Sequence, residues 1–236
     1  MTDDLFMPQE QLLLPLQARH DLSLADITPQ AFASVLSALT QLMQGQLSQV
    51  YIWGEPGSGR SLLLSALMAS QSNASHAVML PLKQVVFMPV EMLDGLEQCP
   101  LVVLDDIDAL RQWPEWQEAV FHFYNRMKAV GGRLLVTGAQ PPADLPLGLA
   151  DLRSRMAASS VYALPACSDE VRSELLAVAG ARRSWNLGDD TVAYLLSRGP
   201  RRLGQFWALI EQLDKFTLQQ KRPLTIPLIR ECMNAA

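Results

Sequence analysis

The sequence of 236 residues has few cysteines, no long apolar run and no excess of basic residues, and each shortage argues against a class of protein. Its three cysteines show no metal-ligand spacing, which argues against a zinc site and fits a reducing compartment. No stretch approaches the roughly 18 consecutive apolar residues of a membrane span. The acidic start, residues 1–4, does not resemble a signal peptide. We therefore expect a cytoplasmic protein that has no contact with a membrane.

The net charge of −5 is unevenly divided along the chain. Residues 1–165 carry 9 Lys/Arg and 16 Asp/Glu, a balance of −7, whereas residues 166–236 carry 10 and 8, a balance of +2. Neither part has the strong basic excess expected of an autonomous DNA-binding domain. The length is sufficient for one α/β domain with a core of its own and a smaller companion domain.

A glycine-rich stretch, Gly54–Ser61, organises the rest of the chain. It follows the apolar run 50–53 and has the spacing of a phosphate-binding loop, G-x-x-x-x-G-K-[ST], with Arg60 in place of the lysine. The glycines let successive N–H groups point at a diphosphate near the start of the next helix, where Ser61 would place its hydroxyl on Mg²⁺. Because a flat guanidinium replaces a compact ammonium, we expect nucleotide binding to persist and hydrolysis by the chain itself to be weak. The nucleotide contacts expected from this loop are Gly54, Pro56, Gly57, Ser58, Gly59, Arg60, Ser61 and Leu62.

Two acidic residues follow a buried strand further along the chain. The run 101–104 is apolar enough for a strand covered on both faces, as in a parallel sheet, and Asp105 and Asp106 come at its carboxyl end. Asp105 would reach Mg²⁺ through water, and Asp106 would orient or deprotonate the attacking water, although such a pair also occurs as a simple helix cap. Thr137, at the end of the strand 133–138, would contact the γ-phosphate or water, or would only cap the strand.

The hydrophobic pattern alternates strands and helices in the first two thirds of the chain and is helical afterwards. We expect an α/β fold, a P-loop parallel sheet with helices on both faces, followed by a small C-terminal helical lid. The expected domains are a tail (1–20), an α/β nucleotide-binding domain (21–165) and the lid (166–236). Expected helices include 30–44, 114–130 and four in the lid, and expected strands include 77–82, 101–104, 133–138 and 161–164.

Two short motifs are open to more than one interpretation. The apolar, proline-stiffened peptide Gln11-Leu12-Leu13-Leu14-Pro15-Leu16 needs a partner surface, either on its own domain or on another protein. Arg153 and Arg155 bracket a serine at the end of a helix. They are either surface salt-bridge residues or an arginine finger, a cation that reaches the triphosphate of a neighbouring subunit.

The phosphate loop, the two polar strand ends, the arginine pair and the helical lid, in this order, resemble the AAA+ nucleotide-binding module. Within that group, Val103–Ile107 and Ser154–Met156 are similar to the acidic and arginine-finger motifs of DnaA. DnaA carries a further helix-turn-helix DNA-binding domain after the lid, whereas this sequence stops at Ala236. The sequence therefore resembles the Hda family of truncated DnaA homologues. Three stretches carry this likeness: Gly59-Arg60-Ser61, the segment 133–149 and the peptide 11–16.

The resemblance implies negative regulation of DNA replication initiation. A protein of this kind would hold ADP and Mg²⁺, would dock on the DNA-loaded sliding clamp, the β subunit of DNA polymerase III, and would stimulate hydrolysis of ATP bound to DnaA. Arg155 is then the finger supplied in trans, with Arg153 as the second choice. DNA would be reached only through the clamp, and self-association as a homodimer stays open. The clamp-binding residues would be Gln11, Leu12, Leu14, Pro15 and Leu16.

One position departs from the family pattern. The second sensor of the family is an arginine on the third lid helix, and the favoured register places Gly204 there. Arg201 or Arg202, about one turn away, would substitute for it. This departure favours a bound diphosphate. Leu24 and Ile27 would contact the base together with the lid, and the sequence does not specify which base.

Two alternatives stay open. The first is a self-sufficient AAA+ ATPase, such as a helicase-loading partner, and Arg60 and the unclear sensor argue against it. The second is a DNA-binding replication adaptor of the DnaA type, against which the acidic balance and the missing helix-turn-helix argue. Hydrolysis by the isolated protein that depends on Asp106 would support the first alternative, and tight, salt-dependent duplex binding without the clamp would support the second.

Overall fold

The computed structural model describes residues 24, 27, 30–70 and 77–234. The expected clamp-binding peptide, residues 11–16, lies outside the described residues.

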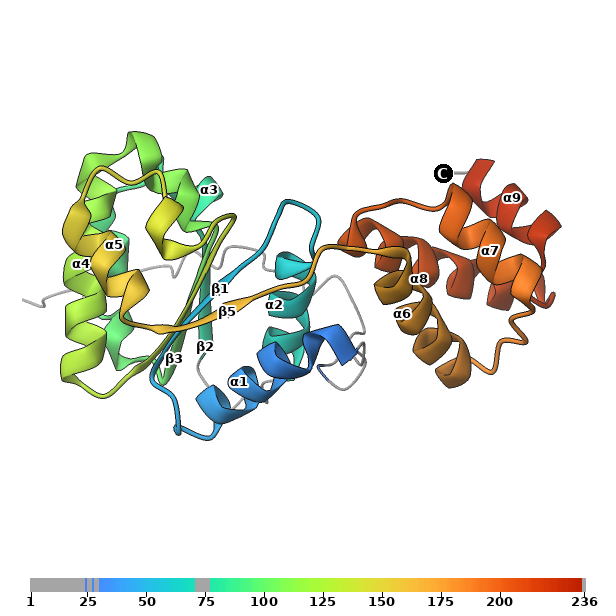
Figure 1. Cartoon of the computed structure of the whole chain (residues 1–236), viewed down its shortest axis with the longest axis horizontal. Coiled ribbons are helices and arrows are strands. Elements are labelled where there is room, and N and C mark those ends of the chain that lie inside the picture. Colours follow the sequence, from blue (N-terminus) through green and yellow to red (C-terminus); the bar gives the residue numbers. More distant parts are fainter. Residues whose placement is uncertain (1–23, 25–26, 28–29, 71–76, 235–236) are drawn as a thin grey trace, which may run out of the picture.

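Five parallel strands form one sheet in the order β2-β3-β4-β1-β5 (Figure 1), which confirms the predicted α/β fold. Because β4 lies between β1 and β3, the carboxyl ends of these three strands meet at one edge of the sheet. The strands are β1 (Gln49–Trp53), β2 (Ala77–Pro81), β3 (Leu101–Asp105), β4 (Arg133–Gly138) and β5 (Ser160–Ala163).

The central strands are buried on both faces, and their side chains alternate between two hydrophobic clusters. In β1, Val50 and Ile52 belong to one cluster and Tyr51 to the other. In β3, Leu101 and Val103 alternate with Val102 and Leu104 in the same manner. Successive side chains of a strand point to opposite faces, so a continuous apolar run is required where helices cover both.

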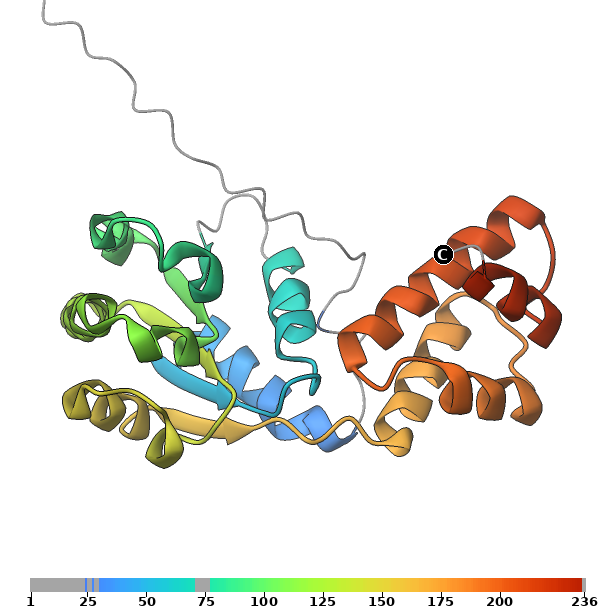
Figure 2. The same ribbon diagram turned by 90° about the horizontal axis from the view of Figure 1, so that it is seen from above.

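Helices cover both faces of the sheet (Figure 2). One face carries α1 (Ala33–Met43) and α2 (Arg60–Ala69), and the other carries α3 (Leu82–Val85), α4 (Pro114–Ala129) and α5 (Ala150–Ala157). Short 3₁₀ segments connect these elements. They are η2 (Gln30–Phe32), η3 (Val90–Leu93), η4 (Leu96–Gln98), η5 (Ile107–Gln112) and η6 (Pro142–Asp144).

The two long helices predicted in the α/β domain are confirmed. The span predicted as 30–44 is formed by η2 and α1, and Gly45 follows with φ of 74°, a conformation that favours glycine. In α4, Trp116 and Val120 are fully buried as predicted. His122 is exposed on the opposite side of that helix, and we assign it no chemistry.

The C-terminal region consists of four helices, as predicted, and lies beside α2 (Figures 1 and 2). Its core is continuous with the cluster on the α1 and α2 face of the sheet. The helix α8 is the longest of the four, and its buried residues extend from Leu203 to Thr217. The lid helices are α6 (Asp169–Arg182), α7 (Asp189–Arg198), α8 (Leu203–Gln220) and α9 (Ile226–Asn234). Across the described part of the chain, none of the helices combines the length and the apolar character needed to cross a membrane.

Candidate functional site

The glycine-rich loop joins β1 to α2 and leaves its N–H groups at the open end of the helix. Gly57 and Gly59 have φ of 99° and 103°, which residues with a Cβ rarely adopt. The first helical hydrogen bond runs from Leu63 N–H to the Gly59 carbonyl. The N–H groups of Arg60 and Ser61 precede that bond and are therefore among the donors at the positive end of α2. This cradle fits a phosphate group.

The lid rests directly on this loop. The N–H of Leu203, the first residue of α8, donates to the Gly57 carbonyl at 2.9 Å. Its side chain covers Gly59, where an added Cβ would lie 2.7 Å from Leu203 Cδ2. The stem of Arg202 lies over Gly57, where an added Cβ would lie 2.9 Å from Arg202 Cγ. Of the two candidate lid arginines, Arg202 is therefore the one placed against the loop.

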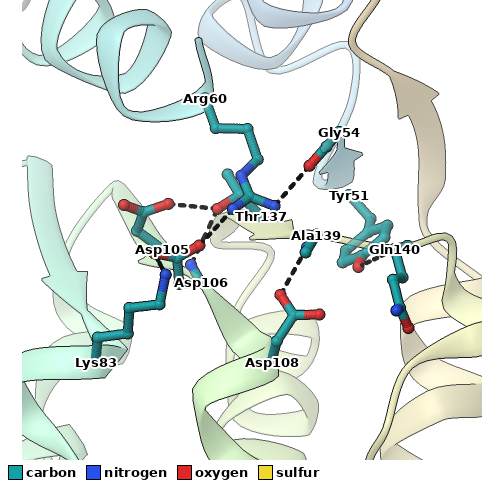
Figure 3. A network of polar contacts seen from close by, with 10 residues as sticks. All are labelled: Tyr51, Gly54, Arg60, Lys83, Asp105, Asp106, Asp108, Thr137, Ala139 and Gln140. Atoms are coloured by element: carbon teal, nitrogen blue, oxygen red, sulfur yellow. Dashed lines mark hydrogen bonds and ion pairs between the residues drawn. The ribbon is translucent and has the colours of Figure 1, made fainter. Parts of the chain in front are cut away.

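The loop arginine is directed toward the acidic pair. Arg60 Nη1 donates to the Gly54 carbonyl at 2.8 Å, and Arg60 Nη2 pairs with Asp106 Oδ1 at 2.7 Å (Figure 3). The other Asp106 oxygen, Oδ2, pairs with Lys83 Nζ at 2.7 Å. We call these three charged residues the Asp106 cluster. Asp106, predicted to activate water, thus has a cation on each carboxylate oxygen, an arrangement that the sequence did not indicate.

Thr137 lies on β4, the strand between β1, which leads to the phosphate loop, and β3, which ends at the acidic pair. Its hydroxyl donates to Asp105 Oδ1 at 2.5 Å and accepts the N–H of Asp106 at 3.1 Å. The side chain is buried. The hydroxyl of Thr137 is thus engaged with both residues of the acidic pair, and its contact with a phosphate or a water stays a prediction.

The two candidate finger arginines differ in their surroundings, although both lie on α5. Arg153 Nη1 donates to the Leu147 carbonyl at 2.8 Å, which fixes that guanidinium to its own chain. The Arg155 guanidinium lies over the Phe121 ring, 5.6 Å from the ring centre. Among the described residues no carboxylate pairs with Arg155. The two guanidinium groups therefore differ in that Arg153 is hydrogen-bonded to its own backbone, whereas Arg155 contacts an aromatic ring.

Comparisons with known proteins agree with this geometry. The family model described as the Hda lid domain matches residues 169–233, which span most of α6 to α9. Domain III of the replication initiation protein DnaA from Thermotoga maritima has a similar structure, with a TM-score of 0.71 at 13% identity over 90% of this chain and 95% of that one. For AMPPCP-bound DnaA from Aquifex aeolicus the TM-score is 0.70 at 15% identity, over 85% of this chain and 68% of that one. For the Holliday junction branch migration motor RuvB from Thermotoga maritima the TM-score is 0.63 at 15% identity, over 92% of this chain and 72% of that one.

Residues 169–233 match the Hda lid domain, and the chain has the fold of DnaA domain III. The likeness to the solved structures establishes the fold, and the family match is confined to the four lid helices.

The remaining predicted site residues lie on α2 and in the core cluster that the lid shares. Ser61 is exposed on the first turn of α2. Ile27 is buried in the cluster that includes the lid core, and Leu24 packs against the same cluster. Both residues thus belong to or border the core that the α/β domain shares with the lid, and their contact with a base stays a prediction. Within residues 30–70 and 77–234, no three metal-ligating side chains gather at one point.

Burial changes the acidity of Asp105. Desolvation raises the pKa of this carboxyl above its ordinary value of 3.8, and neighbouring Asp106 raises it further. The hydrogen bond from Thr137 and the charges of Arg60 and Lys83 act in the opposite direction without cancelling the rise. The structure therefore favours the protonated form of Asp105 relative to the unfolded chain.

The raised pKa of Asp105 predicts how the stability of this protein depends on pH. Since the pKa is higher in the folded chain than in the unfolded one, the contribution of Asp105 is fully present below pH 3.8 and falls as the pH rises through the folded pKa. The free energy of unfolding of the wild type, measured with urea between about pH 4 and pH 7, should therefore fall relative to that of Asp105→Asn. The asparagine does not titrate and supplies the reference. Parallel profiles for the two proteins would contradict the raised pKa.

Proposed function

We propose that this protein is a nucleotide-bound regulator that stimulates hydrolysis of ATP held by DnaA, with Arg155 as the arginine finger. The observation that carries the proposal is the different placement of the two α5 arginines. Arg153 is bound to the Leu147 carbonyl, while Arg155 lies over Phe121 without an ion-pair partner among the described residues. A finger must approach the triphosphate of another subunit, so an unpaired cation suits it.

The phosphate loop is the proposed site for ADP. Its open N–H groups and the start of α2 would hold the diphosphate, and Arg202 would add a cation from the lid side. The exposed hydroxyl of Ser61 would bind Mg²⁺, whereas Asp105, which is buried and accepts the hydroxyl of Thr137, would reach the ion only through water; the ion would neutralise phosphate charge when bound. The similarity to an AMPPCP-bound DnaA supports a nucleotide at this loop.

The Asp106 cluster supports weak hydrolysis by the chain itself. A general base must have an oxygen free to accept the proton of the attacking water. In this structure Oδ1 of Asp106 faces Arg60 and Oδ2 faces Lys83, so both oxygens are held by cations. A bound nucleotide would therefore serve as a conformational ligand that holds the lid against the loop, where Leu203 already bonds to Gly57.

The peptide 11–16 is the proposed link to the sliding clamp. It lies outside the described residues, and its sequence supports the assignment. An extended, proline-stiffened segment with leucine side chains suits a preformed apolar groove at a low ordering cost. Docking on a clamp that encircles DNA would raise the effective concentration of the protein near DnaA.

Removal of residues 11–16 is expected to weaken binding to the DNA-loaded clamp at least about 100-fold, because the apolar contacts of several leucine side chains are lost. Surface plasmon resonance on immobilised clamp would measure the change. A matched deletion of residues 2–7 should bind as the wild type does. Unaltered binding after removal of residues 11–16 would refute the peptide assignment, whereas thermal denaturation should be the same for all three proteins.

A further inference from the structure

The segment 139–149, which connects β4 to the helix that carries Arg155, is held at both ends by polar side chains. At its start, Asp108 Oδ2 accepts the N–H of Ala139 at 2.6 Å (Figure 3). The hydroxyl of Tyr51, in the strand that leads to the phosphate loop, donates to the Gln140 carbonyl at 2.7 Å. The start of the segment is thus bound to the residues that surround the nucleotide site.

At the other end, one buried side chain connects two elements. Gln117 of α4 is only 2% exposed. Its Oε1 accepts the N–H of Leu149, the residue directly before α5, at 2.9 Å. Its Nε2 donates to the Leu110 carbonyl of η5 at 2.7 Å. Both ends of the amide are therefore satisfied by backbone groups, one at the start of α5 and one in the turn that follows Asp106.

The backbone bond of Gln117 complements the apolar packing of α5. Leu152 and Met156 are fully buried in the cluster that also contains Trp116 and Val120 of α4. Apolar contacts are non-directional and do not by themselves specify how far a helix slides or turns. The hydrogen bond to Leu149 is directional, since its strength depends on distance and angle. The side chain of Leu149 does not cap α5, and the bond from Gln117 instead holds the backbone N–H of this N-cap residue.

We propose that Gln117 is a positioning residue for Arg155, which ties the finger helix to the turn behind the acidic pair. Asp108 ties the start of the same segment to that turn. The inference rests on the proposed finger function. It adds that the orientation of Arg155 is set by a buried amide on α4, and that the acidic pair and the finger share one hydrogen-bonded connection.

Gln117→Leu removes both hydrogen bonds at similar volume, and Gln140→Leu is the matched control. The Gln140 side chain is exposed in the same segment, and only its backbone carbonyl takes part in the contact with Tyr51.

Amide hydrogen exchange tests the anchoring without any partner. We expect exchange at residues 149–157 to rise about tenfold in Gln117→Leu, because a buried hydrogen bond is lost. In Gln117→Leu, exchange in α6 to α9 should match that of the wild type. In Gln140→Leu, exchange should match that of the wild type in every element. Unchanged exchange at residues 149–157 would overturn the anchoring.

A double-mutant cycle tests whether Gln117 acts through Arg155. We expect Gln117→Leu to lower the maximal rate of DnaA-bound ATP hydrolysis about tenfold, with an unchanged half-saturating concentration of this protein. In the Arg155→Ala background the same substitution should cause no further loss. The positioning role would be contradicted if the double variant lost the product of the two single-variant factors. It would also be contradicted if Gln117→Leu changed only the half-saturating concentration.

The two readouts separate the inference from the proposed function. If Arg155→Ala leaves the stimulated rate unchanged, the finger assignment is wrong, and the exchange result still decides whether Gln117 anchors α5. If Gln117→Leu does not fold, Gln117→Asn replaces it, because a side chain one methylene shorter cannot span Leu110 and Leu149 at these distances. It should give the same rise in exchange, and wild-type exchange in that variant would overturn the proposal.

Discussion

Replacing Arg155 with alanine is expected to lower the stimulated hydrolysis of DnaA-bound ATP about 10³-fold. In phosphoryl transfer, negative charge on the γ-phosphate oxygens is stabilised in the transition state by a nearby cation. Arg155 lies on a helix held by buried leucine and methionine side chains, and its guanidinium rests on Phe121. The loss should therefore appear in the maximal rate, measured as released phosphate in single-turnover reactions with DnaA loaded with ATP.

Arg153→Ala is the matched control for Arg155→Ala. It removes the hydrogen bond to the Leu147 carbonyl and should reduce the rate only through a small displacement of α5. Both variants should bind the clamp as the wild type does, because the peptide 11–16 is intact in each. Normal stimulation by Arg155→Ala together with a large loss in Arg153→Ala would transfer the finger role to Arg153.

Arg60→Ala should weaken ADP binding at least about 100-fold and should lower the free energy of unfolding by about 2 kcal/mol. The guanidinium is largely buried and holds both the Gly54 carbonyl and Asp106. Its removal leaves a buried carbonyl without a donor at the start of the phosphate loop. Titration calorimetry with ADP and urea denaturation measure the two effects separately.

Lys83→Ala is the control within the Asp106 cluster. Lys83 pairs with the same carboxylate, but its side chain is 63% exposed. An exposed ion pair contributes about 1 kcal/mol or less, so this variant should keep ADP binding and nearly all of the stability. Wild-type ADP affinity in Arg60→Ala would contradict the role of Arg60 in shaping the loop.

Much of the fold could be predicted because its signals are local. The glycine spacing before α2 follows from the positive φ required at Gly57 and Gly59. The apolar run of β3 is continuous because helices cover both faces of the sheet. Ser168 caps α6 by accepting the N–H of Val171, and two acidic residues follow it in the first turn, which is a local signal for the start of a helix.

The contacts that were missed depend on which strands and helices become neighbours. Lys83 reaches Asp106 because β2 pairs with β3. In the sequence, the only indication of this contact is that Lys83 comes just after the end of a strand. Leu203 covers the phosphate loop only once the lid has folded back onto it. Gln117 lies on the buried side of a helix among apolar residues, where the sequence gives no indication of its two backbone partners.

The most direct test of the central claim measures ATP hydrolysis by DnaA in the presence of this protein, ADP and clamp-loaded DNA. Each component is left out in turn. The account predicts stimulation that requires both this protein and the clamp, and little hydrolysis by this protein alone, because both oxygens of Asp106 are paired with cations. No stimulation of DnaA, with hydrolysis by the isolated protein that is lost in Asp106→Ala, would contradict the account and would indicate a self-sufficient ATPase.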